Sequence, residues 1–314
     1  MLRSPPAARA LSLLRRGGNV ALVHVLPDGE RGKTLRELER AASALLRAGC
    51  TRRSLVVAVG GGAVSDAAGF LAASFMRGVE WAAVPTTLLA MVDAAIGGKT
   101  AVNLPVAKNA VGAFHPPSAV LADPAALATL PARELRSGMG EVLKYAALRP
   151  ALLGEISALG RAPPPAALVA ACARAKVEVV RQDPTEKGAR KLLNLGHTFG
   201  HGVEAAGRFE RFTHGEAVAV GLAFAFRLAR RLGRLGPLAV AEMEDAICGA
   251  GLPVRVPAAT ARRAAALMGY DKKRTSAGLR WVLPREQGAA WTVDWDVVAP
   301  PADVAATVDE IAGR

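Results

Sequence analysis

Residues 190–216 read RKLLNLGHTFGHGVEAAGRFERFTHGE and contain three of the five histidines in this 314-residue chain. Imidazole is a common metal ligand and a ready acid or base, so a cluster of this scarce residue predicts a functional site. His197 and His201 are four positions apart, a spacing that places both on one face of a helix. His214 follows within the same stretch. The residues alone therefore predict that three imidazoles point towards one place.

Glycines and a helix-capping motif surround these histidines. Three nearby positions are poor helix formers whose missing side chains let a ligand or another backbone come close, namely Gly196, Gly200 and Gly202. Thr213 and Glu216 form a T-x-x-E capping box, which predicts a second helix with His214 in its first turn. The simpler interpretation is two packed core histidines and an exposed one. The third histidine and the glycines favour a site.

The composition indicates a globular protein. The chain is 51% apolar and 21% charged, and its length allows two domains. The net charge of +13 is spread along the chain, with no long basic block and few aromatic residues, so it favours an anionic small molecule over nucleic acid. Three cysteines far apart are typical of a reducing cytoplasm. No apolar run reaches the roughly 18 residues of a membrane span.

The first part of the chain alternates short apolar runs with helical patterns, which predicts an α/β domain with a parallel sheet. The predicted strands are residues 18–26, 54–59, 81–84 and 120–121, and the predicted helices are residues 34–48 and 63–76. Gly60, Gly61 and Gly62 join the second strand to its helix. Such a turn presents backbone N–H groups at a helix start to a phosphate, although it is also compatible with a simple tight turn.

Two familiar nucleotide-binding patterns do not fit this turn. A G-x-G-x-x-G pattern needs glycine at position 65, which is Ser65, and a P-loop ending at Thr100 needs glycine at position 93, which is Asp93. The glycine triplet with Asp66 behind it remains a phosphate-binding candidate. A second polar cluster follows the strand at 81–84, where open α/β sheets bind ligands: Thr86, Thr87, Asp93, Lys99, Lys108 and Asn109.

The pattern changes after Pro131, where we place a domain boundary. The rest of the chain is mostly amphipathic, with predicted helices at 133–148, 166–181, 217–232 and 240–249 and a closing helix from 301. Residues 281–283 and 289–292 predict a small hairpin. Glu141 and Lys144 share a helix face, a spacing that by itself favours a surface ion pair.

Several long motifs resemble one family. GGGAVSDAAGF (60–70), the 85–117 segment beginning PTTLLAMVDAAIGGKT, LPARELRSGMGEVLKYA (130–146), LNLGHTFGHGVEA (193–205) and HGEAVAVG (214–221) closely resemble 3-dehydroquinate synthases. The resemblance runs from about Asp28 to the C-terminus. It implies an α/β NAD-binding domain at 1–131, an all-α metal- and substrate-binding domain at 132–314, and an active site between them.

The resemblance also implies roles for individual residues. It makes Glu141, His197 and His214 the ligands of Zn²⁺ or Co²⁺, and it makes His201 a substrate and proton-handling residue, which corrects the expectation from the residues alone. The implied NAD contacts are Asp28, Glu30, Lys33, Gly61, Gly62, Ala63, Asp66, Thr86, Thr87, Lys99, Lys108, Leu127 and Thr129. The implied substrate contacts are Asp93, Lys99, Asn109, Lys144, Lys176, Arg190, Asn194 and Lys272 or Lys273. Arg77 resembles a residue that reaches a neighbouring subunit's site, which implies a homodimer.

The implied reaction converts 3-deoxy-arabino-heptulosonate 7-phosphate to 3-dehydroquinate and phosphate, a step of the shikimate pathway to aromatic amino acids. It combines a transient oxidation by NAD, β-elimination of phosphate, reduction and an intramolecular aldol closure. Two alternatives remain: another sugar-phosphate cyclase, acting on sedoheptulose 7-phosphate or forming 2-deoxy-scyllo-inosose, and a non-catalytic paralogue. In the family that the chain resembles, roughly forty more residues with the first strands precede the motif at Asp28. Either the start is misassigned, or this form binds NAD weakly, or it is no longer a full enzyme. For this form we expect an uncovered sheet edge and weaker NAD binding.

Overall fold

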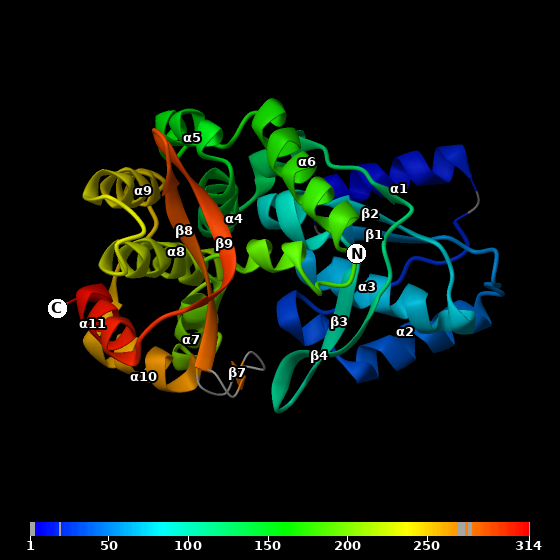
Figure 1. Ribbon diagram of the computed structural model, residues 1–314. Helices are drawn as coiled ribbons and strands as arrows, with labels where there is room; N and C mark the ends of the chain where they lie inside the picture. Colours follow the sequence, from blue (N-terminus) through cyan, green and yellow to red (C-terminus); the bar gives the residue numbers. More distant parts are fainter. Residues whose placement is uncertain (1–3, 19, 269–273, 276–277, 314) are drawn as a thin grey trace. The chain divides into compact units, whose positions relative to one another are not determined.

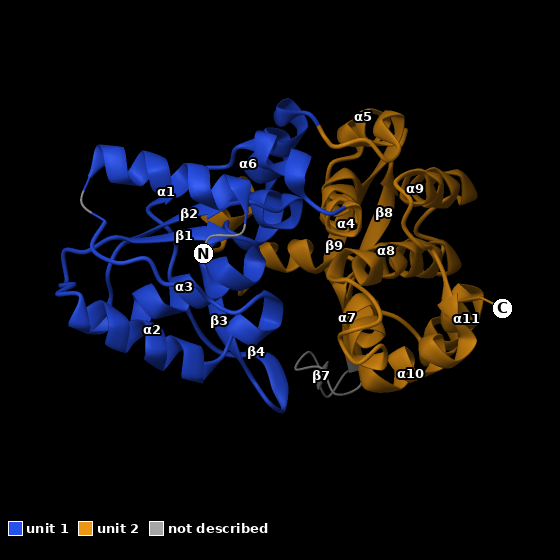
Figure 2. Cartoon of the chain, turned by 180° about the vertical axis from the view of Figure 1, so that it is seen from behind, with its two compact units in different colours: residues 1–131, 165–177 blue, residues 132–164, 178–314 orange. Residues whose placement is uncertain are grey.

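The computed structural model describes residues 4–18, 20–268, 274–275 and 278–313. The chain forms two compact units, coloured separately in Figure 2: residues 1–131 with 165–177, and residues 132–164 with 178–314. The segment 165–177 belongs to the first unit although it follows the predicted boundary at Pro131. The described ranges contain no helix with the length and apolarity that a membrane crossing requires.

The first unit contains the predicted parallel sheet. Its strands are β1 (Val56–Gly60), β2 (Trp81–Pro85) and β5 (Ala119–Val120), in the order β1-β2-β5, and all are parallel. Helix α3 (Gly62–Ser74) packs against β1 and β2, and α2 (Leu35–Arg47) packs against α3 (Figure 1). Helix α1 (Pro5–Gly17) contacts β1. Part of α6 (Ala166–Gln182) also belongs to this unit. The predicted α/β class is confirmed.

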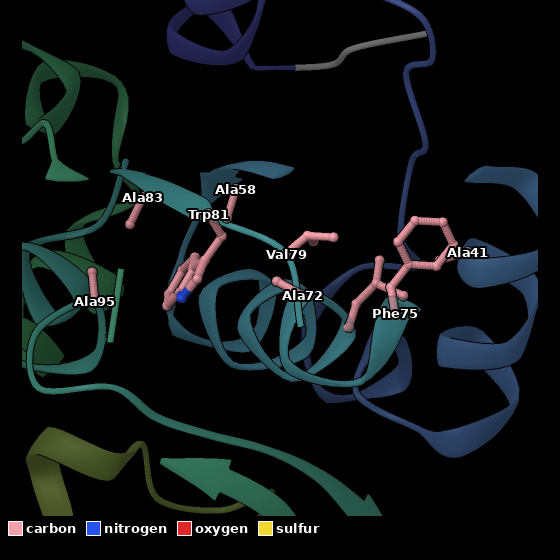
Figure 3. Packing of buried hydrophobic residues seen from close by; sticks show 9 residues of the cluster. Ala41, Ala58, Ala72, Phe75, Val79, Trp81, Ala83 and Ala95 are labelled. Atoms are coloured by element: carbon pink, nitrogen blue, oxygen red, sulfur yellow. The ribbon is translucent and has the colours of Figure 1, made fainter. Parts of the chain in front are cut away.

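Small and large apolar side chains together build the core of this unit (Figure 3): Ala41, Ala58, Leu71, Ala72, Phe75, Val79, Trp81, Ala83 and Ala95. Trp81, at the start of β2, is buried and its indole Nε1 donates a 3.0 Å hydrogen bond to the carbonyl of His115. Ala58 and Ala83 line the sheet, and Ala72 lines α3. Because these side chains are small, the helix can lie close to the strands.

Two features of the first unit differ from the sequence prediction. A strand was predicted at 18–26, but residues 18 and 20–26, the described part of this segment, form no strand and instead line an apolar hollow next to β1. The alternation of VALVHVL suits a strand, but a strand also needs a hydrogen-bonding partner, and the described residues supply none for this segment. An antiparallel hairpin, β3 (Lys99–Leu104) with β4 (Ala107–Phe114), was not predicted.

Helix α8 (His214–Arg231) is the centre of the second unit, because its residues 217–229 are all buried. It packs against α4 (Ala132–Leu148), α7 (His197–Ala206), α9 (Pro237–Gly249) and α11 (Pro301–Ile311). Helix α10 (Ala258–Met268) packs against α7, and α5 (Leu153–Leu159) packs against α4. The predicted helices and the Thr213–Glu216 capping box are confirmed.

The second unit also holds strands, so the expectation of an all-α domain needs correction. Strands β8 (Gly278–Gln287) and β9 (Ala290–Val298) form the predicted hairpin, longer than expected, and β7 (Arg274–Thr275) joins β8. Short strands β6 (Val256–Pro257) and β10 (Ala312–Gly313) pair in parallel. Trp281 of the hairpin stacks on Phe224 of α8, with ring centroids 5.3 Å apart. The hairpin therefore covers the central helix.

Glycines let three helices of this unit cross at close range. A Cβ atom at Gly215 of α8 would lie less than 3.0 Å from the backbone of Ser137 in α4. One at Gly221 would lie equally close to the backbone of Gly196, directly before α7. A ligand or another backbone segment was predicted to come close to the glycines near the histidines. The structure shows that it is a backbone segment.

We expect Gly215→Ala to destabilise the protein by about 1–3 kcal/mol or more, because the added methyl must push α4 and α8 apart. Gly154→Ala is the control: Gly154 lies in α5 with nothing within 4 Å of an added Cβ, so alanine should be neutral or stabilising by about 0.5–1 kcal/mol. Urea unfolding of both variants measures these changes. Equal stability of the two variants would show that the crossing is loosely packed.

Candidate active site

Three ligand-type side chains converge in the second unit. Glu141 lies in α4, and His197 and His214 are the first residues of α7 and α8. Oε1 of Glu141 lies 3.3 Å from Nε2 of His197 and 3.2 Å from Nε2 of His214. One ligand atom from each residue lies within 4.8 Å of the other two. This is the cluster that the resemblance implied.

The outer nitrogens of both imidazoles face acceptors. Nδ1 of His197 lies 3.1 Å from the carbonyl oxygen of Leu195, and Nδ1 of His214 lies 3.3 Å from Oε2 of Glu204. A carbonyl oxygen can only accept, so Nδ1 of His197 carries the hydrogen of that bond. In a neutral imidazole the lone pair is then on Nε2, directed at the Glu141 carboxylate.

Burial and close contacts shift the pKa values of Glu141 and of the two histidines beside it. Burial tends to raise the pKa of the Glu141 carboxyl, but the Lys144 ammonium and the hydrogen bond from His214 hold it well below its usual value. Burial lowers the pKa of His197 despite the nearby carboxylate, so this ring favours its neutral form. For His214, burial acts in the same direction, but its hydrogen bonds to Glu141 and Glu204 outweigh it and raise the pKa to about 10.

This donor set fits a divalent metal ion. A neutral His197 directs a lone pair at a carboxylate oxygen, which is repulsive until a cation lies between them. One carboxylate and two imidazoles are ligands that zinc accepts, and three protein ligands leave a position open for a substrate oxygen.

The prediction that Glu141 and Lys144 form a surface ion pair was wrong. The two residues do form an ion pair, but it is buried: the Glu141 side chain is 0% exposed and the Lys144 side chain 1%.

His201 lies beside the three residues of the cluster but is not one of them. Its ring centroid is 5.4 Å from that of His197 and 6.3 Å from that of His214, and the residue is exposed. It therefore occupies a position from which an imidazole could exchange a proton with a substrate. The prediction from the residues alone, that three imidazoles come together, describes the rings correctly.

Two further candidates lie on the segment before α7. Arg190 is buried, and its guanidinium donates to the carbonyl oxygen of Pro184. Nδ2 of Asn194 donates to Oε1 of Glu186 at 2.7 Å. Asp183 accepts hydrogen bonds from the backbone of Gly188 and Arg190, which fixes the loop. Its pKa is lowered because these N–H groups outweigh its burial.

In the first unit, the glycine turn lies where two parallel strands end. Gly60 of β1 pairs in register with Pro85 of β2, so the glycine turn and Thr86–Thr87 follow the same edge of the sheet. Helix α3 begins at Gly62 after Gly61, and among the described residues no side chain caps it. A helix start at the carboxyl edge of a parallel sheet fits the pyrophosphate of a dinucleotide.

A network of predicted residues lies near this helix start. Lys33 is buried, and its ammonium contacts the side chains of Asp66 and Asn109. Burial raises the pKa of Asp66 although Lys33 opposes that shift. Asn103, which was not among the predicted site residues, links Glu30 to Asn109. Its Nδ2 donates to Oε2 of Glu30 at 2.5 Å, and its Oδ1 accepts from the backbone N–H of Asn109 at 3.0 Å. The structure thus brings Glu30, Lys33, Asp66 and Asn109 together.

A second pair in this unit joins two predicted substrate contacts. Nζ of Lys176 lies 2.8 Å from Oδ1 of Asp93 and 2.6 Å from its carbonyl oxygen. Asp93 lies in a π-helical turn, η3 (Ala90–Ala94). The remaining predicted residues are placed as follows: Ala63 in the first turn of α3, Leu127 buried and Thr129 bonded to the carbonyl of Ala126 in η4 (Pro124–Thr129), and Asp28, Arg77, Lys99 and Lys108 exposed. Lys272 and Lys273 lie outside the described residues.

The ligand assignment predicts which substitutions remove the metal. Elemental analysis of the purified protein should find about one divalent ion per chain, as a three-ligand site implies. His214→Ala should lose it, whereas His201→Ala should retain it because the His201 ring lies outside the cluster. The reverse result, with metal lost only in the His201 variant, would overturn the division of roles.

Comparison with known proteins agrees with the geometry. Residues 23–137 match the family model described as 3-dehydroquinate synthase N-terminal, and residues 138–274 match the 3-dehydroquinate synthase C-terminal model. The chain is 46% identical over 285 residues to the 3-dehydroquinate synthase of Xylella fastidiosa strain M23, covering 86% of this chain and 77% of that protein. It is 45% identical over 301 residues to that of Xanthomonas campestris pv. campestris strain 8004, covering 92% and 80%.

Solved structures of related cyclases have the same fold. The 2-epi-5-epi-valiolone synthase of Streptomyces hygroscopicus subsp. jinggangensis 5008, with NAD⁺ and Zn²⁺ bound, has a TM-score of 0.85 and 29% identity, over 97% of this chain and 86% of that one. A 2-deoxy-scyllo-inosose synthase complexed with carbaglucose-6-phosphate, NAD⁺ and Co²⁺ has a TM-score of 0.81 and 27% identity, over 98% and 88%. With both halves of the family model matched in order, the chain belongs to the 3-dehydroquinate synthase family.

Proposed function

We propose that this chain is a 3-dehydroquinate synthase, which converts 3-deoxy-arabino-heptulosonate 7-phosphate to 3-dehydroquinate and phosphate. The observation that carries the proposal is the cluster of the buried Glu141 and His197 with the half-buried His214, in a chain 45–46% identical to curated 3-dehydroquinate synthases. We further propose that the division at Pro131 separates an NAD-binding domain from a metal- and substrate-binding domain. A cytoplasmic location remains a prediction.

The proposed cofactors are NAD and a zinc or cobalt ion, which the two solved cyclases contain. The glycine turn with Lys33, Asp66, Thr86 and Thr87 would hold NAD, and the Glu141 cluster would hold the metal. When bound, NAD supplies a reversible hydride acceptor, and the metal supplies a Lewis acid for substrate oxygens.

The side chains of the chain then bind and orient the substrate. Lys144 keeps Glu141 ionised, and the buried pair holds α4 residues in place. Cationic side chains would bind the phosphate and the carboxylate of the substrate. The planar guanidinium of Arg190 is well matched to the carboxylate, because it can donate two parallel hydrogen bonds. His201, exposed beside the cluster, is placed to take and return a proton at a substrate hydroxyl.

A second candidate function is another sugar-phosphate cyclase. The two structures above support it, because one is a valiolone synthase and the other an inosose synthase. Their identities of 29% and 27% are well below the 45–46% shared with 3-dehydroquinate synthases, so the carboxylate-bearing substrate is favoured. The complete donor set argues against a non-catalytic paralogue.

Release of inorganic phosphate tests the substrate. The zinc-loaded protein should release it from the heptulosonate phosphate only when NAD is present. It should do so about ten- to hundredfold faster, in kcat/KM, than from sedoheptulose 7-phosphate or glucose 6-phosphate, because those substrates lack one charge-assisted contact. Preference for sedoheptulose 7-phosphate would place the chain with the other cyclases. No release from any of the three by metal-loaded protein would favour the paralogue.

We also propose that the enzyme is a homodimer in which Arg77 serves the neighbouring site. Arg77 is exposed, and it lies in a run of left-handed residues with φ of 49° at Met76 and 68° at Arg77. Side chains rarely adopt this conformation, and such strain clusters at functional positions.

Mixing two inactive variants tests this proposal. Arg77→Ala and His214→Ala homodimers should each lose activity, and subunit exchange should restore part of it, because a mixed dimer has one site with both an intact cluster and a partner arginine. A sedimentation coefficient of a monomer, or no recovery after demonstrated exchange, would contradict it.

A further inference from the structure

Glu204 was not among the predicted site residues. It lies against the cluster of Glu141, His197 and His214. Glu204 lies in α7, and its side chain is only 11% exposed. It is seven residues after His197 and three after His201, so all three side chains lie along one stripe of the helix. Helix α8 packs against this helix, and its first residue, His214, contacts Glu204. A nearly buried carboxylate is costly unless it is hydrogen-bonded, so its partner is informative.

One partner of Glu204 is the outer nitrogen of His214. Oε2 of Glu204 lies 3.3 Å from Nδ1, on the side of the ring opposite to Glu141. A carboxylate is an acceptor, so it fixes the hydrogen on Nδ1 and leaves Nε2 for the cluster. His197 is held in the same way, but by the neutral carbonyl of Leu195. The two histidines therefore differ in the acceptor that their Nδ1 faces in these contacts. It is a charged carboxylate for His214 and a neutral carbonyl for His197.

Resting on the proposed function for the identity of the cluster, we propose that Glu204 is a positioning residue for the metal. It orients the His214 ring, fixes its tautomer and increases the electron density at Nε2, so that this nitrogen binds a divalent cation more tightly. A carboxylate behind a metal-binding histidine has this effect in general, and its removal weakens metal affinity by about 10–100-fold. Glu204 itself does not contact the substrate or the metal in this account.

A purely structural role is the competing explanation. Glu204 joins α7 to the start of α8, so its loss could simply destabilise that junction. The two explanations differ in what changes: the structural role alters unfolding, whereas the positioning role alters metal affinity in protein that remains folded.

The test is zinc binding alone, without substrate or NAD. Competition with a chelator should give a dissociation constant about 10–100-fold weaker for Glu204→Ala than for the wild type. Glu204→Gln keeps the shape and an acceptor oxygen but loses the charge, so a smaller loss is expected. Glu210→Gln is the matched control, since it removes the same charge from an exposed position six residues later and should bind zinc normally.

A spectroscopic measurement separates tautomer control from general disturbance. In the zinc-loaded wild type, ¹⁵N-histidine NMR should show His214 with hydrogen on Nδ1 and metal on Nε2, and the Nδ1–H signal should shift in Glu204→Gln. Unchanged zinc affinity in folded Glu204→Gln and Glu204→Ala would overturn the proposal even if the wild type turns over substrate. Conversely, a zinc-binding protein without turnover would reject the proposed function while leaving the role of Glu204 intact.

Discussion

The cluster of Glu141, His197 and His214 depends on the close crossing of three helices, α4, α7 and α8. Gly215 allows the backbone of α8 to touch that of α4, and Gly221 allows it to touch the turn before α7. Because Glu141 lies in α4 and the two histidines are the first residues of α7 and α8, these crossings set the distances of 3.2 and 3.3 Å in the cluster. Packing of small residues in the core of the second unit thus sets the geometry of the ligand side chains.

The buried charge of Glu141 is balanced by groups with separate roles. Lys144 lies one helical turn away and neutralises the carboxylate, while the two imidazoles face its other oxygen. A buried carboxylate without such partners would take up a proton and lose its value as a ligand. The contacts behind each imidazole, Leu195 for His197 and Glu204 for His214, fix the rings from outside. The ligand set is therefore oriented by the protein itself.

The sequence predicted local features well and long-range features poorly. The capping box at Thr213 and the helix it starts depend on neighbouring residues only, and both are confirmed. Residues 18–26 have a strand pattern, but strand formation depends on a distant partner, and the prediction was wrong for the described residues 18 and 20–26. Glu141 and Lys144 looked like a surface pair because spacing along a helix does not reveal which face is buried. The family resemblance supplied the ligand set, and Glu204 was missed because its role depends on the crossing of α7 and α8.

X-ray absorption at the zinc edge of the loaded protein tests the central claim most directly, namely that these three helices form one metal centre. The account predicts two imidazole nitrogens at about 2.0–2.1 Å and one carboxylate oxygen at about 2.0–2.2 Å, with the remaining position held by oxygen from solvent or substrate. The imidazole signature should fall to one ring in any His197 or His214 variant that still binds zinc. A sulfur scatterer, or a wild-type spectrum without two imidazoles, would contradict the account.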